Sequence, residues 1–209
     1  MTGASASRRP IRNVVFDVGW VFVHLNPRPI LEFLAGLGVA TTTIDALIES
    51  VSLDDHETGR LHGQGLLERL SALSEQQPIA LEALHSKWVD MFELQPAMID
   101  LAHRLSHRYR VYLLSNIGDL HWAHLCREYR LHHIGHGVLP SYLAGVMKPH
   151  EGIYIEAERR FALTPAETVF IDDRAENIAA ARARGWHGIV HSAYAPTVEG
   201  LRALGVYYA

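Results

Sequence analysis

The stretch NVVFDVGWVF, residues 13–22, decides the fold of this chain. It begins as a continuous apolar run, which is typical of a strand buried on both faces of a parallel sheet. The run ends on a lone carboxylate, Asp17, and a glycine, Gly19, follows two positions later. Ligands of open α/β sheets bind outside the carboxyl ends of the strands. Asp17 is therefore the first candidate functional residue.

Further short apolar runs predict the rest of the sheet. They are RVYLLSN at 110–116, TVFIDD at 168–173, GIVHS at 188–192 and, more weakly, HGVLPS at 136–141. Longer helical patterns separate them, so strand and helix alternate with right-handed crossovers. The sequence predicts an α/β fold, a Rossmann-like three-layer core with a parallel sheet.

One block interrupts this alternation. Residues 28–96 contain helical patterns and no convincing strand, and prolines mark both edges of the block. We expect a small helical domain inserted after the first strand. The expected organisation is a flexible tail at 1–12, a core domain at 13–27 and 97–209, and the helical insertion at 28–96.

Composition excludes several classes of protein. The formal net charge of −4 over 209 residues argues against a nucleic-acid-binding protein. No stretch approaches the roughly 20 apolar residues of a membrane helix, and the first residues lack the apolar segment of a secretory signal. The single cysteine, Cys126, has no partner for a disulfide in the chain, which favours a reducing compartment. We expect a cytoplasmic protein and leave its oligomeric state open.

Polar side chains gather where the predicted strands end. The loop GVMKPHEG at 145–152 adds a lysine, so the candidate set is Asp17, Ser115, Asn116, Lys148, Asp172 and Asp173. A carboxylate can attack phosphorus and form an acyl-phosphate. A phosphate dianion repels that carboxylate, so a hard divalent cation such as Mg²⁺ is expected, with oxygen ligands from the acids. Lysine and serine would stabilise the phosphoryl oxygens.

Four ordered motifs carry a resemblance to a known family. FDVGWVF (16–22), LLSN (113–116), GVMKPHEGIY (145–154) and VFIDDRAENI (169–178) resemble the motifs of the haloacid dehalogenase-like hydrolases. The helical insertion resembles the cap of that superfamily. The nearest resemblance is to its α-glucose-1-phosphate phosphatase-like branch, whose first motif is aspartate-x-glycine. The match covers almost the whole chain after the first ten or so residues.

The resemblance implies a role for each residue that carries the chemistry. Asp17 would be the nucleophile, and Lys148 would hold nucleophile and phosphate together. Ser115 would bind the phosphoryl group, with Asn116 beside it.

The resemblance also implies a magnesium site. Asp17 and Asp173 would be direct ligands, and Asp172 would lie close by, acting through a water. Gly19 would donate its backbone carbonyl.

Gly19 is also a departure from the superfamily's pattern. Most phosphatases of the superfamily carry an acid–base aspartate at this position, and such help is typically worth about 10²- to 10⁴-fold. Its loss would confine turnover to good leaving groups or require a donor from elsewhere. The polar stretch SLDDHETGRLHG (52–63) offers His56 and Glu57, which either contact the substrate or lie in a solvated turn. Trp20 either stacks on a sugar ring or packs under the cap.

The sequence therefore predicts a Mg²⁺-dependent phosphatase for a small phosphomonoester, with a sugar phosphate as the expected substrate. Two alternatives stay open. One is a metal-independent 2-haloacid dehalogenase, which uses the same aspartate against carbon. The other is a catalytically weakened protein that binds a phosphate or a partner, because Gly19 replaces the usual aspartate. No nucleic-acid or membrane partner is expected.

Overall fold

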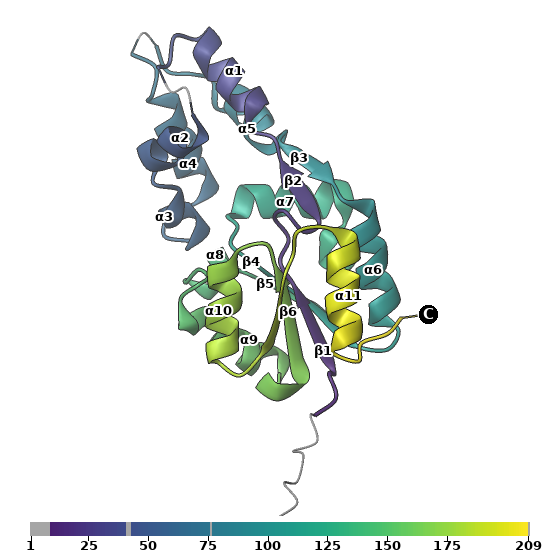
Figure 1. The fold of residues 1–209 in the computed structure, drawn as a ribbon. Coiled ribbons are helices and arrows are strands. Elements are labelled where there is room, and N and C mark those ends of the chain that lie inside the picture. The colour runs from purple at the N-terminus through teal and green to yellow at the C-terminus, as the bar shows by residue number, and fades with distance from the viewer. Residues whose placement is uncertain (1–8, 41–42, 76, 209) are drawn as a thin grey trace, which may run out of the picture.

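The chain forms a core built on a parallel sheet and a smaller helical part beside one end of that sheet (Figure 1). The computed structural model describes residues 9–40, 43–75 and 77–208. The five strands run in the order β5-β4-β1-β6-β7, and every neighbouring pair is parallel. They are β1 (Asn13–Phe16), β4 (Arg110–Ser115), β5 (Gly137–Pro140), β6 (Thr168–Asp172) and β7 (His187–Val190).

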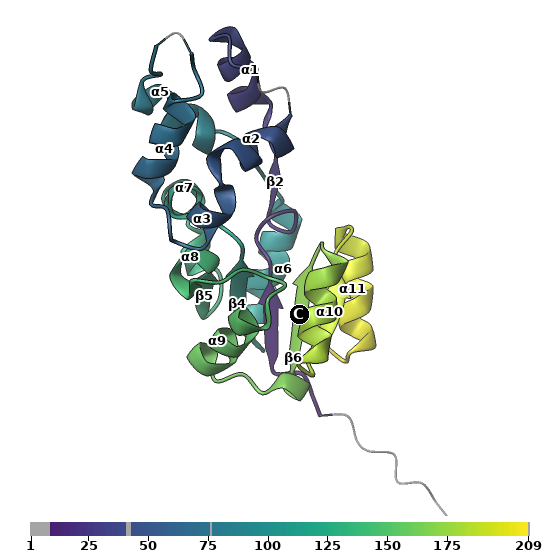
Figure 2. The same cartoon turned by 90° about the vertical axis from the view of Figure 1, so that its left-hand side faces the viewer.

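Helices cover both faces of the sheet (Figure 1), and Figure 2 looks onto one of these faces. Alternate residues of each strand point to opposite faces, and both sets pack against helices. Val14 and Phe16 pack into one core with residues of α6, α7 and α11, whereas Val15 packs into a second core with residues of α9 and α10. The helices of the core domain are α6 (Pro96–Ser106), α7 (Asp119–Tyr129), α8 (Ser141–Ala144), α9 (Glu151–Phe161), α10 (Ala175–Ala183) and α11 (Tyr194–Ala203), with 3₁₀ turns η1 (Leu131–His133) and η2 (Pro165–Glu167). The sequence-based prediction of a three-layer α/β core is confirmed.

The inserted part, which we call the cap, has a hydrophobic core of its own. Its helices are α1 (Arg28–Gly36), α2 (Ile44–Val51), α3 (Leu53–Glu57), α4 (Gly63–Ser71) and α5 (Leu81–Val89). Leu34, Leu47, Leu70, Leu84 and Trp88 are fully or almost fully buried within it. Two short antiparallel strands, β2 (Val23–Leu25) and β3 (Phe92–Leu94), connect the cap to the core domain.

Two local expectations were wrong. The predicted all-helical block contains β3. Phe92–Leu94 is strand because β2, some 70 residues earlier along the chain, pairs with it, as Val23 does with Leu94. The polar stretch after α2 was not expected to be helical, yet it contains α3. The five expected strands, including the weak fifth, are all present.

No helix in the described ranges is both long and apolar enough to cross a bilayer. Cys126 lies half-buried on α7.

Candidate active site

The order of the strands brings the candidate residues together. β1 lies between β4 and β6 in the sheet. Asp17 directly follows β1, Ser115 ends β4 and Asp172 ends β6. Since the carboxyl ends of parallel strands meet at one edge, the three side chains converge on one site. All three are buried.

Lys148 lies at the centre of this site. Its Nζ is 2.8 Å from Asp17 Oδ2 and 2.7 Å from Asp172 Oδ2, and it donates a 3.0 Å hydrogen bond to the carbonyl oxygen of Leu114. Burial works to lower the pKa of Lys148, but the negative charges of Asp17 and Asp172 outweigh burial and raise it. Lys148 therefore stays an ammonium, held 5.3 Å above the ring of Phe170.

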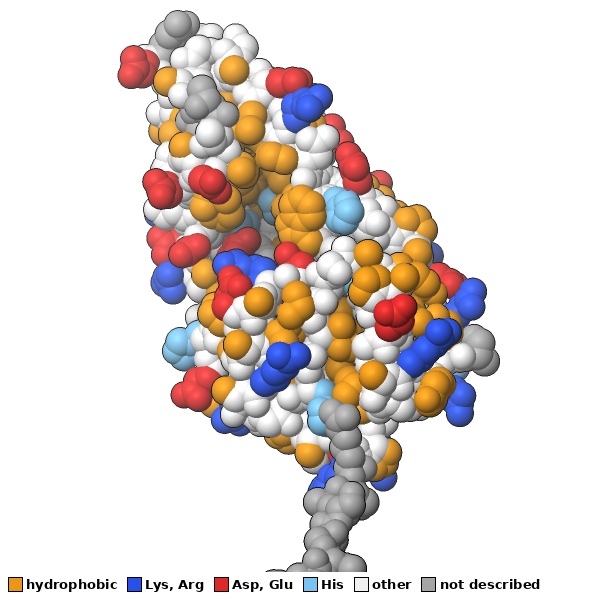
Figure 3. Space-filling view, in the orientation of Figure 1, with side chains coloured by type: hydrophobic (Ala, Val, Ile, Leu, Met, Phe, Trp, Pro, Cys, Tyr) orange, Lys and Arg blue, Asp and Glu red, His pale blue; other side chains and the backbone are white. Residues whose placement is uncertain are grey.

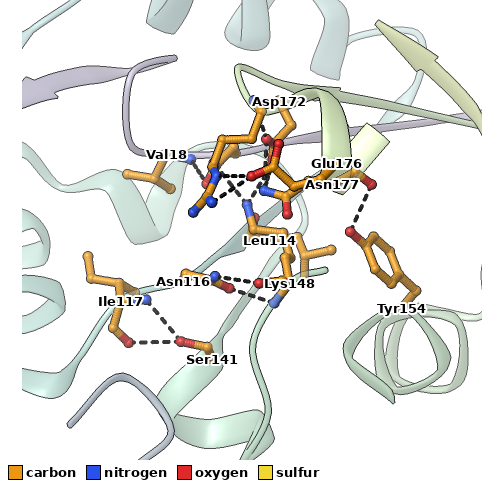
Figure 4. Close-up of polar contacts among 12 residues, drawn as sticks. Val18, Leu114, Asn116, Ile117, Ser141, Lys148, Tyr154, Asp172, Glu176 and Asn177 are labelled. Carbon is orange, nitrogen blue, oxygen red and sulfur yellow. Dashed lines mark hydrogen bonds and ion pairs between the residues drawn. The ribbon is translucent and has the colours of Figure 1, made fainter. Parts of the chain in front are cut away.

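Asp172 is saturated with hydrogen bonds. Besides Lys148, its carboxylate accepts the side-chain amide of Asn177 at 2.9 and 3.1 Å (Figure 4). It also accepts the backbone N–H of Arg174 at 2.8 Å. Asn177 was not assigned as a site residue from the sequence, although the asparagine after the Asp-Asp pair was the available signal. Asp172 thus orients Lys148, and Asn177 orients Asp172.

Three carboxyl groups form a cluster that fits a divalent cation. One carboxylate oxygen from each of Asp17, Asp172 and Asp173 lies within 4.8 Å of the other two. Burial raises the pKa of Asp17 to about 7, against the opposing effect of Lys148, and burial together with Asp172 raises that of Asp173. Three carboxylates around one ammonium leave two negative charges, which a divalent cation with oxygen ligands would neutralise.

Asn116 holds the lysine loop in place. Its side-chain amide donates to the carbonyl oxygen of Lys148 at 2.9 Å and accepts the N–H of Lys148 at 2.8 Å. These bonds fasten the loop to the end of β4. The assignments of Asn116 and Ser115 as substrate-binding residues remain predictions, although both line a small cavity of about 50 Å³ beside Gly19.

Glu57 reaches the same cavity from the cap. Burial, together with the negative charges of Asp54 and Asp17, raises the pKa of Glu57 to about 7. The backbone carbonyl of Glu57 accepts a 2.5 Å hydrogen bond from Ser141 Oγ, which in turn accepts the N–H of Ile117 at 2.9 Å. Glu57 therefore faces the site and does not lie in a solvated turn.

The neighbouring histidine plays a structural part. His56 is buried, and its Nδ1 lies 3.0 Å from the carbonyl oxygen of Leu61. A Cβ added to Gly118, at the start of α7, would overlap the His56 ring. The contact between cap and core domain thus requires glycine at this position, and His56 is not free to reach a substrate.

Trp20 and Gly19 occupy the turn after Asp17. Trp20 adopts a left-handed backbone conformation (φ 56°), and it is 49% exposed. It lines a cavity between cap and core domain, so it is not packed beneath the cap. A Cβ at Gly19 would meet only Leu25 Cδ1, at an ordinary 3.8 Å. The space next to Gly19 is therefore open enough for a side chain.

Two curated relatives and one solved structure match most of this chain. A D-ribitol-5-phosphate phosphatase of Bacteroides thetaiotaomicron is 27% identical, over 80% of this chain and 85% of its own. A sesquiterpene phosphatase of Aspergillus oryzae is 24% identical, over 84% of this chain and 87% of its own. The crystal structure of a haloacid dehalogenase family enzyme from B. thetaiotaomicron, in complex with magnesium and inorganic phosphate, superimposes with a TM-score of 0.78 at 23% identity, covering 88% of this chain and 95% of the other.

The family model for haloacid dehalogenase-like hydrolases matches residues 26–185, which is more than half of the chain. This range includes Lys148 and the Asp172–Asp173 pair that the geometry brings together with Asp17. The chain belongs to the haloacid dehalogenase-like hydrolase family.

Proposed function

We propose that this protein is a Mg²⁺-dependent phosphatase that hydrolyses a small phosphomonoester through a phospho-aspartate on Asp17. The observation that carries the proposal is the contact of Asp17 and Asp172 with one buried ammonium, Lys148, with Asp173 completing the carboxylate cluster. A carboxylate so placed can attack phosphorus, while Lys148 balances charge on the phosphoryl oxygens. Ser115 donates its hydroxyl to those oxygens.

Asp17, Asp173 and the backbone carbonyl of Gly19 would hold the magnesium ion. When bound, the ion supplies positive charge that lowers the repulsion between a carboxylate and a phosphate dianion. Asp172 is not a direct ligand in this proposal, because its oxygens already accept hydrogen bonds from Lys148, Asn177 and Arg174. It positions the lysine and stays near the ion.

Glu57 acts as the general acid and base, because position 19 is a glycine and carries no carboxyl group. When Asp17 attacks phosphorus, the bond to the leaving oxygen breaks, and protonated Glu57 gives that oxygen its proton. In the second step a water attacks the phospho-aspartate and releases phosphate, and the Glu57 carboxylate takes the proton of that water. A pKa of about 7 suits both directions of transfer near neutral pH.

The experiment measures inorganic phosphate released from p-nitrophenyl phosphate, ribitol 5-phosphate and primary alkyl phosphates, with Mg²⁺ or with a chelator. We expect release only with Mg²⁺, loss of release in Asp17→Asn, and retention in the surface control Asp100→Asn. Equal release from Asp17→Asn would remove the covalent mechanism. Halide release from a 2-haloacid that a chelator leaves unchanged would favour the dehalogenase instead. Tight binding of a phosphate analogue without turnover would favour the binding protein.

A further inference from the structure

A cavity of about 240 Å³ lies between the cap and the core domain. Hydrophobic side chains gather around the hollow between the two parts on the face shown in Figure 3. Its apolar wall comes from the turn after β1, from α2 and α3, and from the end of α5 and the residues after it: Trp20, Ile44, Ile48, Leu53, Trp88 and Met91. The cap thus contributes most of a hydrophobic chamber.

The chamber adjoins the place where the phosphoryl group would bind. Leu25, Glu57 and His121 line both the chamber and the small cavity beside Ser115. These shared residues mark the boundary between the two spaces. The leaving oxygen of a bound ester lies between its phosphorus and its organic group. If the phosphoryl group binds beside Ser115, the leaving oxygen would lie near Glu57 and the organic group of the ester would lie in the chamber.

Few side chains of the chamber could serve the hydroxyl groups of a sugar or polyol. His121 Nε2 already lies 2.9 Å from the carbonyl oxygen of Trp88, and the rings of these two residues stack at 5.0 Å. Burial lowers the pKa of His121 to about 4, so its ring is neutral and adds no charge to the wall. The remaining polar groups of the lining side chains are the Glu57 carboxyl, His121 Nδ1 and the indole nitrogens of Trp20 and Trp88. Hydroxyl groups buried without partners cost binding free energy.

We propose that the organic group of the substrate is apolar, an alkyl, isoprenoid or aryl group of roughly ten carbons or fewer, and that the chamber selects it. The size follows from volume, because a cavity of about 150 Å³ holds benzene and this one is about 240 Å³. This inference rests on the proposed phosphatase function and replaces the expected sugar phosphate with a different class of alcohol.

The test uses a homologous series of primary alkyl phosphates: ethyl, butyl, hexyl, octyl and dodecyl phosphate. Their leaving groups have similar reactivity, so differences in kcat/KM report on the chamber. We expect kcat/KM to rise about fourfold per added methylene until the chamber is full, as burial of each methylene predicts. We expect it to fall for dodecyl phosphate and to be low for ribitol 5-phosphate and glucose 6-phosphate. A flat series, or a preference for either polyol phosphate, would overturn the proposal.

Two variants of Ile48 sharpen the test. Ile48→Asn should reduce the slope of the series, because it places an amide in the apolar wall. Ile48→Trp should move the maximum to a shorter chain, because it fills part of the volume. The matched control is Ile155→Asn on α9, at a residue that is 43% exposed. It should keep the slope and maximum of the wild type. An unchanged series in both folded Ile48 variants would count against the chamber.

Binding measurements separate this inference from the function on which it rests. Alkyl phosphonates of the same lengths cannot be hydrolysed, and their Kd values follow from calorimetry. Tighter binding of longer alkyl phosphonates, without phosphate release from any ester, would contradict the phosphatase function. It would still support binding of an apolar group in the chamber. Mg²⁺-dependent phosphate release without any dependence on chain length would support the phosphatase function and contradict the apolar substrate.

Discussion

Ser141 Oγ lies 2.5 Å from the carbonyl oxygen of Glu57, although 84 positions separate the two residues in the sequence. The same hydroxyl oxygen accepts the backbone N–H of Ile117, just after β4. One buried serine therefore joins the proposed acid in the cap to the loop that follows the proposed phosphoryl-binding serine. This bridge holds the backbone of Glu57 against the loop that follows Ser115.

Ser141→Ala should lower kcat by roughly tenfold to a hundredfold, because a displacement of about 1 Å is enough for such a loss. The unpaired N–H of Ile117 should also cost about 1–3 kcal/mol of unfolding free energy. Steady-state kinetics and urea unfolding measure the two effects. The control is Ser106→Ala, which removes an exposed 2.7 Å hydrogen bond from a serine hydroxyl to a carbonyl oxygen on α6. It should change neither kcat nor the free energy of unfolding. A stability loss with unchanged kcat would show that the bridge does not position Glu57.

Glu57→Gln should lower kcat by about 10²- to 10⁴-fold for alkyl phosphates, and by less for p-nitrophenyl phosphate, whose leaving group needs no proton. Because Glu57 must be protonated to act as the acid, wild-type kcat/KM should fall as pH rises above about 7. This fall should be absent from Glu57→Gln. Glu49→Gln, on the exposed side of α2, should keep the wild-type profile. If the kcat/KM of Glu57→Gln still fell above pH 7, the titrating group would be a residue other than Glu57.

Gly19→Asp should restore part of the activity of Glu57→Gln. A Cβ at Gly19 meets only an ordinary contact with Leu25, so the backbone of the turn leaves room for the first atom of a side chain. The added carboxyl would stand where most phosphatases of the superfamily carry their acid. The double variant Gly19→Asn with Glu57→Gln is the control, since an amide has the shape without the proton. Equal rates in the two double variants would contradict this explanation.

Lys148→Met should abolish phosphate release and lower stability by about 3 kcal/mol at neutral pH, because it leaves the buried Asp17 and Asp172 carboxylates without their cation. The pKa of Asp17, which burial already raises, would then rise further, because Lys148 no longer opposes that rise. Stability lost through a raised carboxyl pKa grows as pH rises. Urea unfolding should therefore show a larger defect at pH 8 than at pH 5. Lys87→Met on α5 should show no such dependence on pH.

Asp173→Asn should weaken Mg²⁺ binding by at least about tenfold, the loss typical even for groups that only support a metal ligand. Calorimetry with Mg²⁺ alone measures this without recourse to activity. Asp100→Asn, an exposed residue of α6 paired with Arg104, should bind like the wild type. Unchanged binding in Asp173→Asn would remove this carboxylate from the proposed site.

Gly118→Ala should destabilise the contact between cap and core domain. The added methyl overlaps the buried His56 ring, and overpacking of this kind costs about 1–3 kcal/mol. Gly36→Ala is the matched control, because nothing lies within 4 Å of its added Cβ. As a helical glycine it should gain up to about 1 kcal/mol instead. Thermal unfolding of both variants distinguishes a steric effect from the loss of a glycine as such.

The sequence by itself determined the sheet and the residues at its edge. Apolar runs ending on Asp17, Ser115 and Asp172 were enough, because parallel strands bring their carboxyl ends together wherever they stand in the chain. The apolar pattern of a helix or a buried strand depends on residues that are neighbours in the sequence. These elements could therefore be predicted from short stretches.

Only the tertiary structure decided how the cap meets this edge. The β2–β3 pairing, the bridge from Ser141 to Glu57 and the bonds from Asn177 to Asp172 depend on which surfaces come into contact. The apolar chamber is likewise built from α2, α3, α5 and the turn after β1. Burial, which sets the pKa of Glu57 and the polarity of the chamber, arises from contacts between distant segments, and no local stretch of sequence records it.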